Sequence, residues 1–261
     1  MRKLKNSVWK LKTPAEIEIL RAGGRRLAQI MDELTRAVRP QIKTAELERL
    51  AREEIKPAGG RPAFLNYQPA GAKRPFPAAL CVSVNDEVVH GLPGERQLIE
   101  GDIVSLDLGL EHQGMFTDMA VTVPVGRVSA AAAKLIRVTV RALELGIAAA
   151  RPGGRLGDIG AAIESFVSGQ GFGLVREFGG HGVGFRVHEE PEVPNYGRAG
   201  QGLELQPGLV MAIEPMVTAG RGAVQTAPDG FTVRTSDGNL AAHFEHTIAI
   251  TRHGPEILTR I

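Results

Sequence analysis

The chain has 261 residues, 43% of them hydrophobic and 23% charged, which is enough for one large domain or two small ones with a sizeable core. Its 31 basic residues exceed its 29 acidic residues by two, which gives no electrostatic reason to expect binding to DNA or to a membrane surface. No apolar run approaches the roughly 20 residues of a membrane span, no signal peptide is evident, and Cys81 is the single cysteine; these features favour a cytoplasmic protein without an internal disulfide.

A basic N-terminal tail over residues 1–12 is the first region that we distinguish. Its basic residues are Arg2, Lys3, Lys5, Lys10 and Lys12. We expect this tail to be solvated, and weak contact with an anionic surface such as RNA is the alternative.

Residues 13–261 are expected to form one domain that begins with two helices. The first is predicted over residues 13–38, where Thr13 can act as the N-cap and Glu16 lies three residues later, as in a capping box. Gly23–Gly24 weaken the middle of this helix. A second helix is predicted from Thr44 to just before Pro57.

The same order of elements then occurs a second time. Residues 61–125 are rich in β-branched residues and turn signals, which predicts strands and loops. Helical periodicity returns over residues 129–150, and Asp158 can cap a fourth helix that runs through about Val167. Strands and turns are predicted beyond it, so helix, helix and strands recur in two halves, about 13–125 and 129–251.

Each half offers two apolar strands that each carry one acid. Asp107 and Glu214 both lie six residues after a glycine, in GDIVSLD and GLVMAIE. Asp118 and Glu245 each closely follow a phenylalanine and precede an alternating apolar run. This match predicts an internal duplication and an α+β fold, with two pseudo-symmetric halves of antiparallel sheet and helices packed outside; chance similarity between short apolar strands is the alternative.

Asp107 and Asp118 are predicted to lie in one hairpin that turns at His112-Gln113. A two-residue connection at that point places the two carboxylates directly opposite each other, on the same face. Facing carboxylates in apolar surroundings are unfavourable unless something compensates their charge, and divalent cations would do so. Two ordinary exposed acids are the alternative.

Two glutamates hold matching positions in the second half. Glu214 ends an apolar strand directly before Pro215, whose ring restricts the preceding residue to extended geometry. Glu245 interrupts an apolar strand and shares one face with His243 and Thr247.

His181 lies in the glycine-rich stretch FGGHGVGF, and His188 follows seven residues later. Two core or surface histidines would be unremarkable by themselves. Together with the four acids, however, one imidazole makes an oxygen-dominated ligand set that suits Mn, Fe, Co or Zn. Four carboxylates neutralise two divalent ions, so the sequence predicts a two-metal site. The predicted ligands are Asp107, Asp118, His181, Glu214 and Glu245.

In their order and motifs these residues resemble the metal set of the methionine aminopeptidases. The motifs are LDLG, FTDMAVTV, GGHGVG, VHEEP, AIEP and FEHTIAI, and the resemblance spans about residues 13–250. It implies the pita-bread fold shared with prolidase and aminopeptidase P. The short spacing after the second motif histidine and the single cysteine resemble the first, bacterial-style type, without a separate N-terminal domain or zinc-finger extension.

The resemblance also implies how the ligands are shared between the metals. Asp118 and Glu245 would bridge the two ions. Asp107 would bind one ion, and His181 and Glu214 would bind the other.

Three catalytic roles follow from the same resemblance. Glu214 would act as the general base towards the attacking water. His188 would hydrogen-bond the carbonyl oxygen of the first residue as charge develops there. His90, in EVVHGLP, matches a histidine that contacts the scissile nitrogen, and a satisfied structural histidine is the alternative at that position.

A pocket for a linear thioether side chain is expected to be soft and partly aromatic. By alignment of motifs, its lining would comprise Phe64, Tyr67, Cys81 and Phe231, although each would more often be plain core. The stretch QPAGAKRPFPAA departs from the family by its length, and Phe76 within it is a further candidate for the lining. Val187 stands where an aromatic residue is common, which would leave the pocket roomier.

The implied activity is removal of the N-terminal methionine from nascent proteins and peptides with a small second residue. The alternatives are a related Xaa-Pro aminopeptidase or prolidase-like peptidase, and a non-catalytic pita-bread binding module. We expect a monomer whose partners are nascent polypeptide N-termini, and contact with the ribosome is left open. The chain's own Met1 precedes the large residue Arg2, so we expect it to be retained.

Overall fold

The computed structural model describes residues 9–68 and 73–261 of the chain. Four helices occupy the predicted places: α1 (Pro14–Ala37), α2 (Thr44–Ile55), α3 (Ala130–Ala149) and α4 (Leu156–Gly169). Thr13 and Glu16 form the expected capping box of α1, in which the Thr13 N–H donates to the Glu16 carboxylate at 2.7 Å. The prediction for α4 was wrong by one turn: Arg155 is the N-cap, and Asp158, inside the helix, accepts from the Arg155 N–H at 2.7 Å.

Antiparallel strands make up the rest of the fold. They are β1 (Arg61–Pro62), β2 (Leu80–Val84), β3 (Glu87–Val89), β4 (Ile103–His112), β5 (Met115–Pro124), β6 (Gly173–Leu174), β7 (Gly180–Gly182), β8 (Glu189–Val193), β9 (Val210–Ile213), β10 (Met216–Thr218), β11 (Val224–Thr226), β12 (Val233–Thr235), β13 (Ala241–His243), β14 (Glu245–Thr251) and β15 (Gly254–Ile257). The main sheet has the order β1-β4-β5-β14-β9-β7-β8, with β2 on β4 and β15 on β14; two smaller sheets have the orders β13-β10-β6 and β11-β12-β3.

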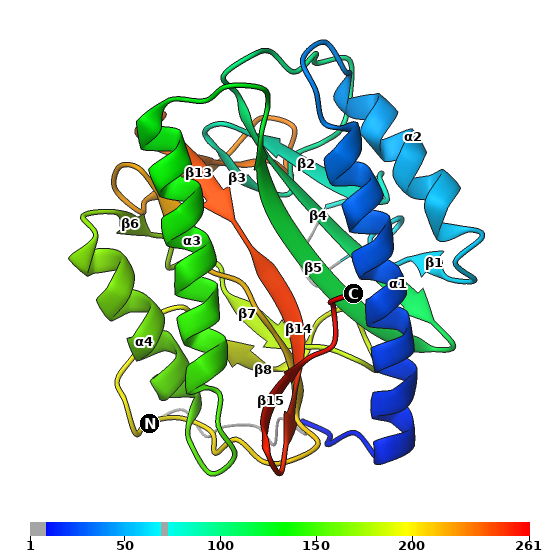
Figure 1. Cartoon of the computed structure of the whole chain (residues 1–261), viewed down its shortest axis with the longest axis vertical. Helices are drawn as coiled ribbons and strands as arrows, with labels where there is room; N and C mark the ends of the chain where they lie inside the picture. The colour runs from blue at the N-terminus through cyan, green and yellow to red at the C-terminus, as the bar shows by residue number, and fades with distance from the viewer. Residues whose placement is uncertain (1–8, 69–72) are drawn as a thin grey trace.

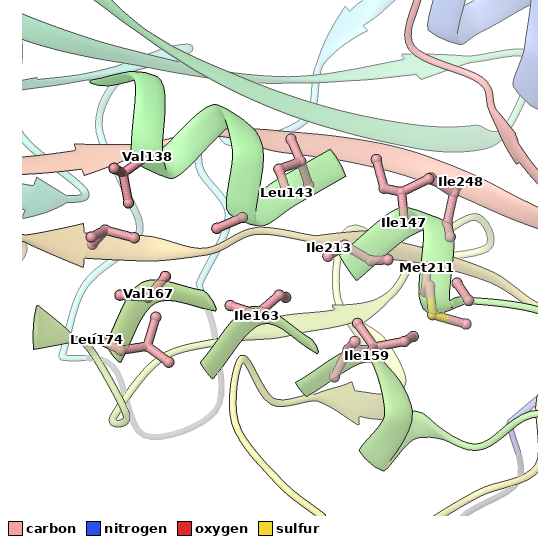
Figure 2. Packing of buried hydrophobic residues seen from close by; sticks show 14 of the residues in the cluster. Val138, Leu143, Ile147, Ile159, Ile163, Val167, Leu174, Met211, Ile213 and Ile248 are labelled. Carbon is pink, nitrogen blue, oxygen red and sulfur yellow. The ribbon is translucent and has the colours of Figure 1, made fainter. Parts of the chain in front are cut away.

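Each helix pair covers its own half of the main sheet. Helix α1 packs on β4 and β5 and on α2, whereas α3 packs on α4, β9, β10 and β13. Figure 1 shows the two pairs on either side of the molecule, with β5 and β14 running between them. Apolar side chains from α3, α4, β9 and β14 interdigitate in the second half (Figure 2), and a separate apolar cluster fills the first half. The helices therefore occupy one face of the sheet and leave its other face to the acidic residues.

The two glycines that weaken the α1 pattern allow the helix to approach its neighbours. A Cβ on Gly24 would lie 2.4 Å from the carbonyl oxygen of Leu258, and a Cβ on Gly23 would lie 3.1 Å from the Cβ of His112. The glycines thus exchange helix propensity for close packing against the hairpin and the C-terminal segment.

The β4–β5 hairpin has a register different from the predicted one. His112 pairs with Met115, so the turn lies at Gln113-Gly114 rather than at His112-Gln113. Both turn residues have positive φ, 52° and 80°, as the two central residues of a type I′ turn require. Gly109 consequently lies opposite Asp118, and the prediction that Asp107 faces Asp118 directly was wrong.

The N-terminal segment is only partly described, and one of its lysines is not solvated. Arg2, Lys3 and Lys5, like Met1, lie outside the described residues. Lys12, which we expected in solvent, is 4% exposed and pairs with Glu189. Burial lowers the pKa of Lys12, and the Glu189 carboxylate opposes this effect. Among residues 9–68 and 73–261, no helix combines the length and apolar character needed to cross a membrane.

Candidate metal and catalytic site

Four adjacent strands bring the four predicted acidic ligands together. The order β4-β5-β14-β9 places Asp107, Asp118, Glu245 and Glu214 side by side, with Glu214 directly after the end of β9. Ala120 of β5 pairs with Asp107 on one side and with Glu245 on the other, so these two acids share one face of the sheet. Asp118 lies two residues from Ala120 and therefore points to the same face.

The predicted histidine ligand completes the cluster from β7. Nε2 of His181 lies 3.4 Å from Oε1 of Glu214, 3.9 Å from Oε1 of Glu245 and 4.0 Å from Oδ2 of Asp118. Candidate ligand atoms lie within 4.8 Å of one another in three overlapping groups: Asp107, Asp118 and Glu245; His181, Glu214 and Glu245; and Asp118, His181 and His188. The first two groups share Glu245, and the first and third share Asp118, so two carboxylates are common to neighbouring groups.

The donor set fits divalent cations because several of its oxygens have nothing else to bind. Oδ1 of Asp107, Oδ1 of Asp118 and Oε1 of Glu245 are buried and have no hydrogen-bond partner within the described chain. Buried carboxylate oxygens without partners are strongly unfavourable unless a positive charge compensates them. The residues present therefore suit an oxygen-rich divalent site with one imidazole.

Burial and mutual repulsion favour the protonated carboxyl groups when no cation is bound. Burial, followed by the charge of Glu214, raises the pKa of Asp107 to about 8. Burial and Asp107 raise the pKa of Asp118, and burial and Asp118 raise the pKa values of Glu214 and Glu245. Cations that bind here must displace protons, so the site is expected to bind metal more tightly as pH rises.

The histidines around the acids are neutral at pH 7, the form in which imidazole binds metals and donates a single hydrogen bond. Burial lowers the pKa of His181 and of His90 to about 4. Burial, His181 and His90 lower the pKa of His188 to about 3. The Nδ1 atom of His188 lies 2.9 Å from the Tyr67 hydroxyl, and its ring lies edge-on to His181 with centroids 4.3 Å apart.

His90 has an unusual backbone and an aromatic neighbour. It follows β3 with φ of 58°, a left-handed conformation that is uncommon for residues other than glycine. Its ring packs edge-on against Phe178, with centroids 5.7 Å apart. A non-glycine residue in this conformation, in the same cleft as the acids, is consistent with a site that requires the imidazole in one place.

An apolar pocket adjoins the acidic cluster. Phe64, Phe76 and Cys81 are buried in one cluster with Val187, and Tyr67 and Phe231 are packed against it. Phe76 and Phe231 meet edge to face with centroids 5.5 Å apart, so Phe76 lies among the predicted lining residues. Cys81 pairs with Asp107 across β2 and β4, which joins the apolar pocket directly to the ligand set.

All the predicted site residues line one cleft of about 1680 Å³. They comprise the five ligands, His90, His188, Phe64, Tyr67, Cys81, Phe231 and Phe76. The arrangement can hold divalent ions, present neutral imidazoles to a reacting group and accept an apolar side chain beside the acids.

Comparison with known proteins shows which family the chain belongs to. The model of metallopeptidase family M24 matches residues 18–252 of the chain. The chain belongs to metallopeptidase family M24. Methionine aminopeptidase 1 of Bacillus subtilis (strain 168) is 47% identical over 250 residues, which cover 96% of this chain and 98% of the relative. A methionine aminopeptidase of Aquifex aeolicus (strain VF5) is 45% identical over 249 residues, 94% of this chain and 96% of the relative.

Two solved structures resemble the chain to different degrees in fold and in sequence. The crystal structure of a methionine aminopeptidase from Thermotoga maritima superposes with a TM-score of 0.92 at 43% identity, covering 97% of this chain and all of that one. Prolidase from Pyrococcus furiosus has a TM-score of 0.74 at 20% identity and covers 96% of this chain but 65% of its own. The expected pita-bread fold is thereby confirmed, and the prolidase likeness concerns the fold alone.

Membership of M24, a metallopeptidase family, makes the chain a hydrolase that works with a divalent metal. Three residues near the M24 site were not assigned a role from the sequence. Phe178 supports His90, Trp9 lines the cleft from the N-terminal segment, and His243 lies behind the glutamates. Strand alternation had placed His243 on the same face as Glu245, and this pattern could have marked it as a site residue. No local pattern marks Phe178 or Trp9, because contacts between distant parts of the chain bring them to the cleft.

Proposed function

We propose that this chain removes the N-terminal methionine from peptides and nascent proteins whose second residue is small. The observation that carries the proposal is that one cleft contains both groups of residues. A cluster of carboxylates and imidazole, several of whose oxygens have no hydrogen-bond partner, lies beside an apolar, partly aromatic pocket. Membership of family M24 and relatives named methionine aminopeptidases at up to 47% identity support it.

Five residues would hold the metal in this proposal. Asp107 would bind one divalent ion, His181 and Glu214 would bind the other, and Asp118 and Glu245 would contribute to both. This sharing agrees with the spatial groups, in which Asp118 and Glu245 each lie with Asp107 and also with His181. Either Co, Mn, Fe or Zn suits this donor set. When bound, such ions supply Lewis-acid polarisation and lower the pKa of water towards neutrality.

Glu214 would be the general base of the reaction. Its position is set by its backbone, because the Asn195 side-chain amide donates to the Glu214 carbonyl at 3.0 Å and Pro215 follows directly. Burial, followed by the charge of Asp118, raises the pKa of Glu214 in the metal-free protein. Bound cations would favour its ionised form, which is the form that a general base requires.

His188 would stabilise the developing charge on the substrate carbonyl oxygen. The phenol of Tyr67 keeps its proton at neutral pH, because the ordinary pKa of a tyrosine is about 10 and burial raises it further. Its O–H can therefore donate to Nδ1 of His188. The neutral His188 ring then carries its hydrogen on Nε2, where it is free to donate to an oxygen in the cleft. His90, held against Phe178, would hydrogen-bond the scissile nitrogen and assist proton delivery to the departing amine.

The methionine side chain would occupy the apolar pocket. A thioether is unbranched and polarizable, and it makes favourable contacts with aromatic rings at the positions that Phe64, Tyr67 and Phe231 provide. Cys81 would close the end of the pocket nearest Asp107. In this role the chain acts as a cytoplasmic monomer of the first, bacterial-style type on nascent N-termini, and brief contact with the ribosome would bring those N-termini within reach.

Paired peptide assays test this proposal. Metal-free protein should release no methionine from Met-Ala-Ser, and release should return when Mn or Co is added back. An Ala-Pro peptide should remain uncleaved under the same conditions. Cleavage of Ala-Pro in preference to Met-Ala-Ser would favour an Xaa-Pro peptidase, and no cleavage of either with any of the four metals would favour a non-catalytic binding module.

A further inference from the structure

His243, at the end of β13, is a buried imidazole that the proposed reaction leaves without a role. It is 1% exposed, and neither Nδ1 nor Nε2 has a hydrogen-bond partner within the described residues. A buried polar group without partners destabilises a fold, so an apolar residue would be expected here if the position served packing alone. The imidazole therefore calls for a physical explanation.

Carboxylate oxygens of two candidate ligands approach this imidazole. Nε2 of His243 lies 3.4 Å from Oε2 of Glu214 and 4.0 Å from Oε2 of Glu245. His181 approaches the same two glutamates through their other oxygens, at 3.4 Å and 3.9 Å from the two Oε1 atoms. Each carboxylate thus lies between two imidazoles, with one oxygen turned to each.

The backbone of His243 is fixed by the first half of the molecule. Its N–H donates to Oγ1 of Thr122 at 2.8 Å, and the Thr122 hydroxyl donates back to the His243 carbonyl at 2.8 Å. Ser105 of β4 in turn hydrogen-bonds Thr122 at 2.8 Å. The backbone of His243 is therefore tied to β5, while the carboxylates that its ring faces lie directly after β9 and at the start of β14.

The His243 imidazole has the chemistry to donate a hydrogen bond to Glu214. Neutral imidazole carries one N–H, which at 3.4 Å is a short movement from a hydrogen bond to Glu214. Partners behind metal-binding side chains commonly orient them in this way.

We propose that His243 is a positioning residue that donates its Nε2–H to Oε2 of Glu214 and keeps the Oε1 atoms of Glu214 and Glu245 turned towards His181. This inference rests on the proposed metal-dependent function, and it adds to that function a residue that acts on the ligands from behind. It predicts that metal affinity depends on a hydrogen-bond donor at position 243.

The test measures metal affinity by competition between apoprotein and a chelating dye for Mn, in the absence of substrate. His243→Leu removes the donor and should weaken metal binding by about 10- to 100-fold, the range found when such supporting partners are removed. His243→Gln keeps an N–H donor of similar reach and should remain near the wild-type affinity. His246→Gln is the matched control, because His246 on β14 bonds Oγ1 of Thr259 at 2.9 Å instead of the cluster.

Thermal melting of each apoprotein shows whether it folds. If His243→Leu does not fold, His243→Asn replaces it, because its amide is too short to reach Glu214 and should also weaken binding. Wild-type affinity in a folded Leu or Asn variant, or a loss in Gln equal to that in Leu, would overturn the inference alone. Failure of the wild-type protein to bind any metal would overturn the proposed function together with it.

Discussion

Glu214 combines two demands on one side chain, because it is both a candidate ligand and the proposed base. Its Oε1 faces His181 and its Oε2 faces His243, so neither oxygen is free to turn away without losing a contact. Glu214→Gln keeps the shape and removes the charge and the basicity. We expect kcat to fall by about 10²–10⁴-fold, the usual contribution of general acid–base catalysis, with little change in the melting temperature of the apoprotein.

Glu177→Gln serves as the control for this measurement, since Glu177 is an exposed acid on the rim of the same cleft. Its turnover of Met-Ala-Ser should match that of the wild type. Full turnover in Glu214→Gln would remove Glu214 from the role of base.

A substitution in the aromatic pocket should change KM more than kcat, because the pocket is proposed to bind the methionine side chain. Phe231 is half-buried between Phe76 and the guanidinium of Arg74, whose centre lies 4.7 Å from the ring centroid. Phe231→Ala should raise KM for Met-Ala-Ser by about tenfold, equivalent to roughly 1.4 kcal/mol of lost apolar contact, with a smaller change in kcat. Steady-state kinetics on Met-Ala-Ser measure both constants, and an unchanged KM would exclude Phe231 from the pocket.

At the scale of the elements, the predicted register of the β4–β5 hairpin was wrong, but the predicted face of its two acids was correct. Asp107 and Asp118 were predicted to face each other, yet their pairing is displaced by two residues because the turn is formed by Gln113 and Gly114. Side chains alternate with a period of two, so a displacement by two residues keeps both acids on one face. Strand alternation and motif order were therefore enough to predict the acidic cluster.

Long-range contacts were beyond the reach of the same reasoning. Lys12 was expected in solvent because its neighbours are basic, but tertiary folding buries it against Glu189, 177 residues away in the chain. Phe178 and His90 likewise meet across the two halves. Periodicity describes which face a side chain takes within an element, and it does not say which distant element covers that face.

Helix α1 offers a prediction that belongs to packing rather than to chemistry. Gly24→Ala would place a methyl group 2.4 Å from a backbone oxygen of Leu258, which must then move. We expect a loss of about 1–3 kcal/mol in the free energy of unfolding, as for other overpacked sites, although alanine favours helices. Gly169→Ala in α4 is the control, because nothing lies within 4 Å of its added Cβ, and it should be neutral or stabilising. Urea denaturation measures both variants, and equal stabilities would contradict the close approach.

At the scale of the whole molecule, the acidic cluster joins the two halves of the main sheet. Asp107 and Asp118 come from the first half, and Glu214 and Glu245 come from the second, so each half contributes like charges to the junction between β5 and β14. In the metal-free protein, ionised carboxylates at this junction repel one another, which favours their protonated forms, whereas bound cations would attract all four. Stability should therefore depend on both metal and pH.

The sign of that dependence follows from the raised carboxyl pKa values. In metal-free protein the pKa of Asp107 is raised from 3.8 to about 8, so the folded state binds this proton more tightly than the unfolded state does. Its stabilising contribution is present below pH 4 and is lost as pH rises through about 8. The melting temperature of the metal-free protein should accordingly fall between about pH 6 and pH 8.5. Over the same range, added Mn should stabilise the folded protein increasingly, because fewer protons compete for the carboxylates.

Calorimetry with and without Mn at the two pH values measures the difference in melting temperature. Asp107→Asn, which cannot ionise, should flatten the pH dependence of the metal-free protein, and a metal-induced shift that shrinks as pH rises would contradict the cluster as a cation site.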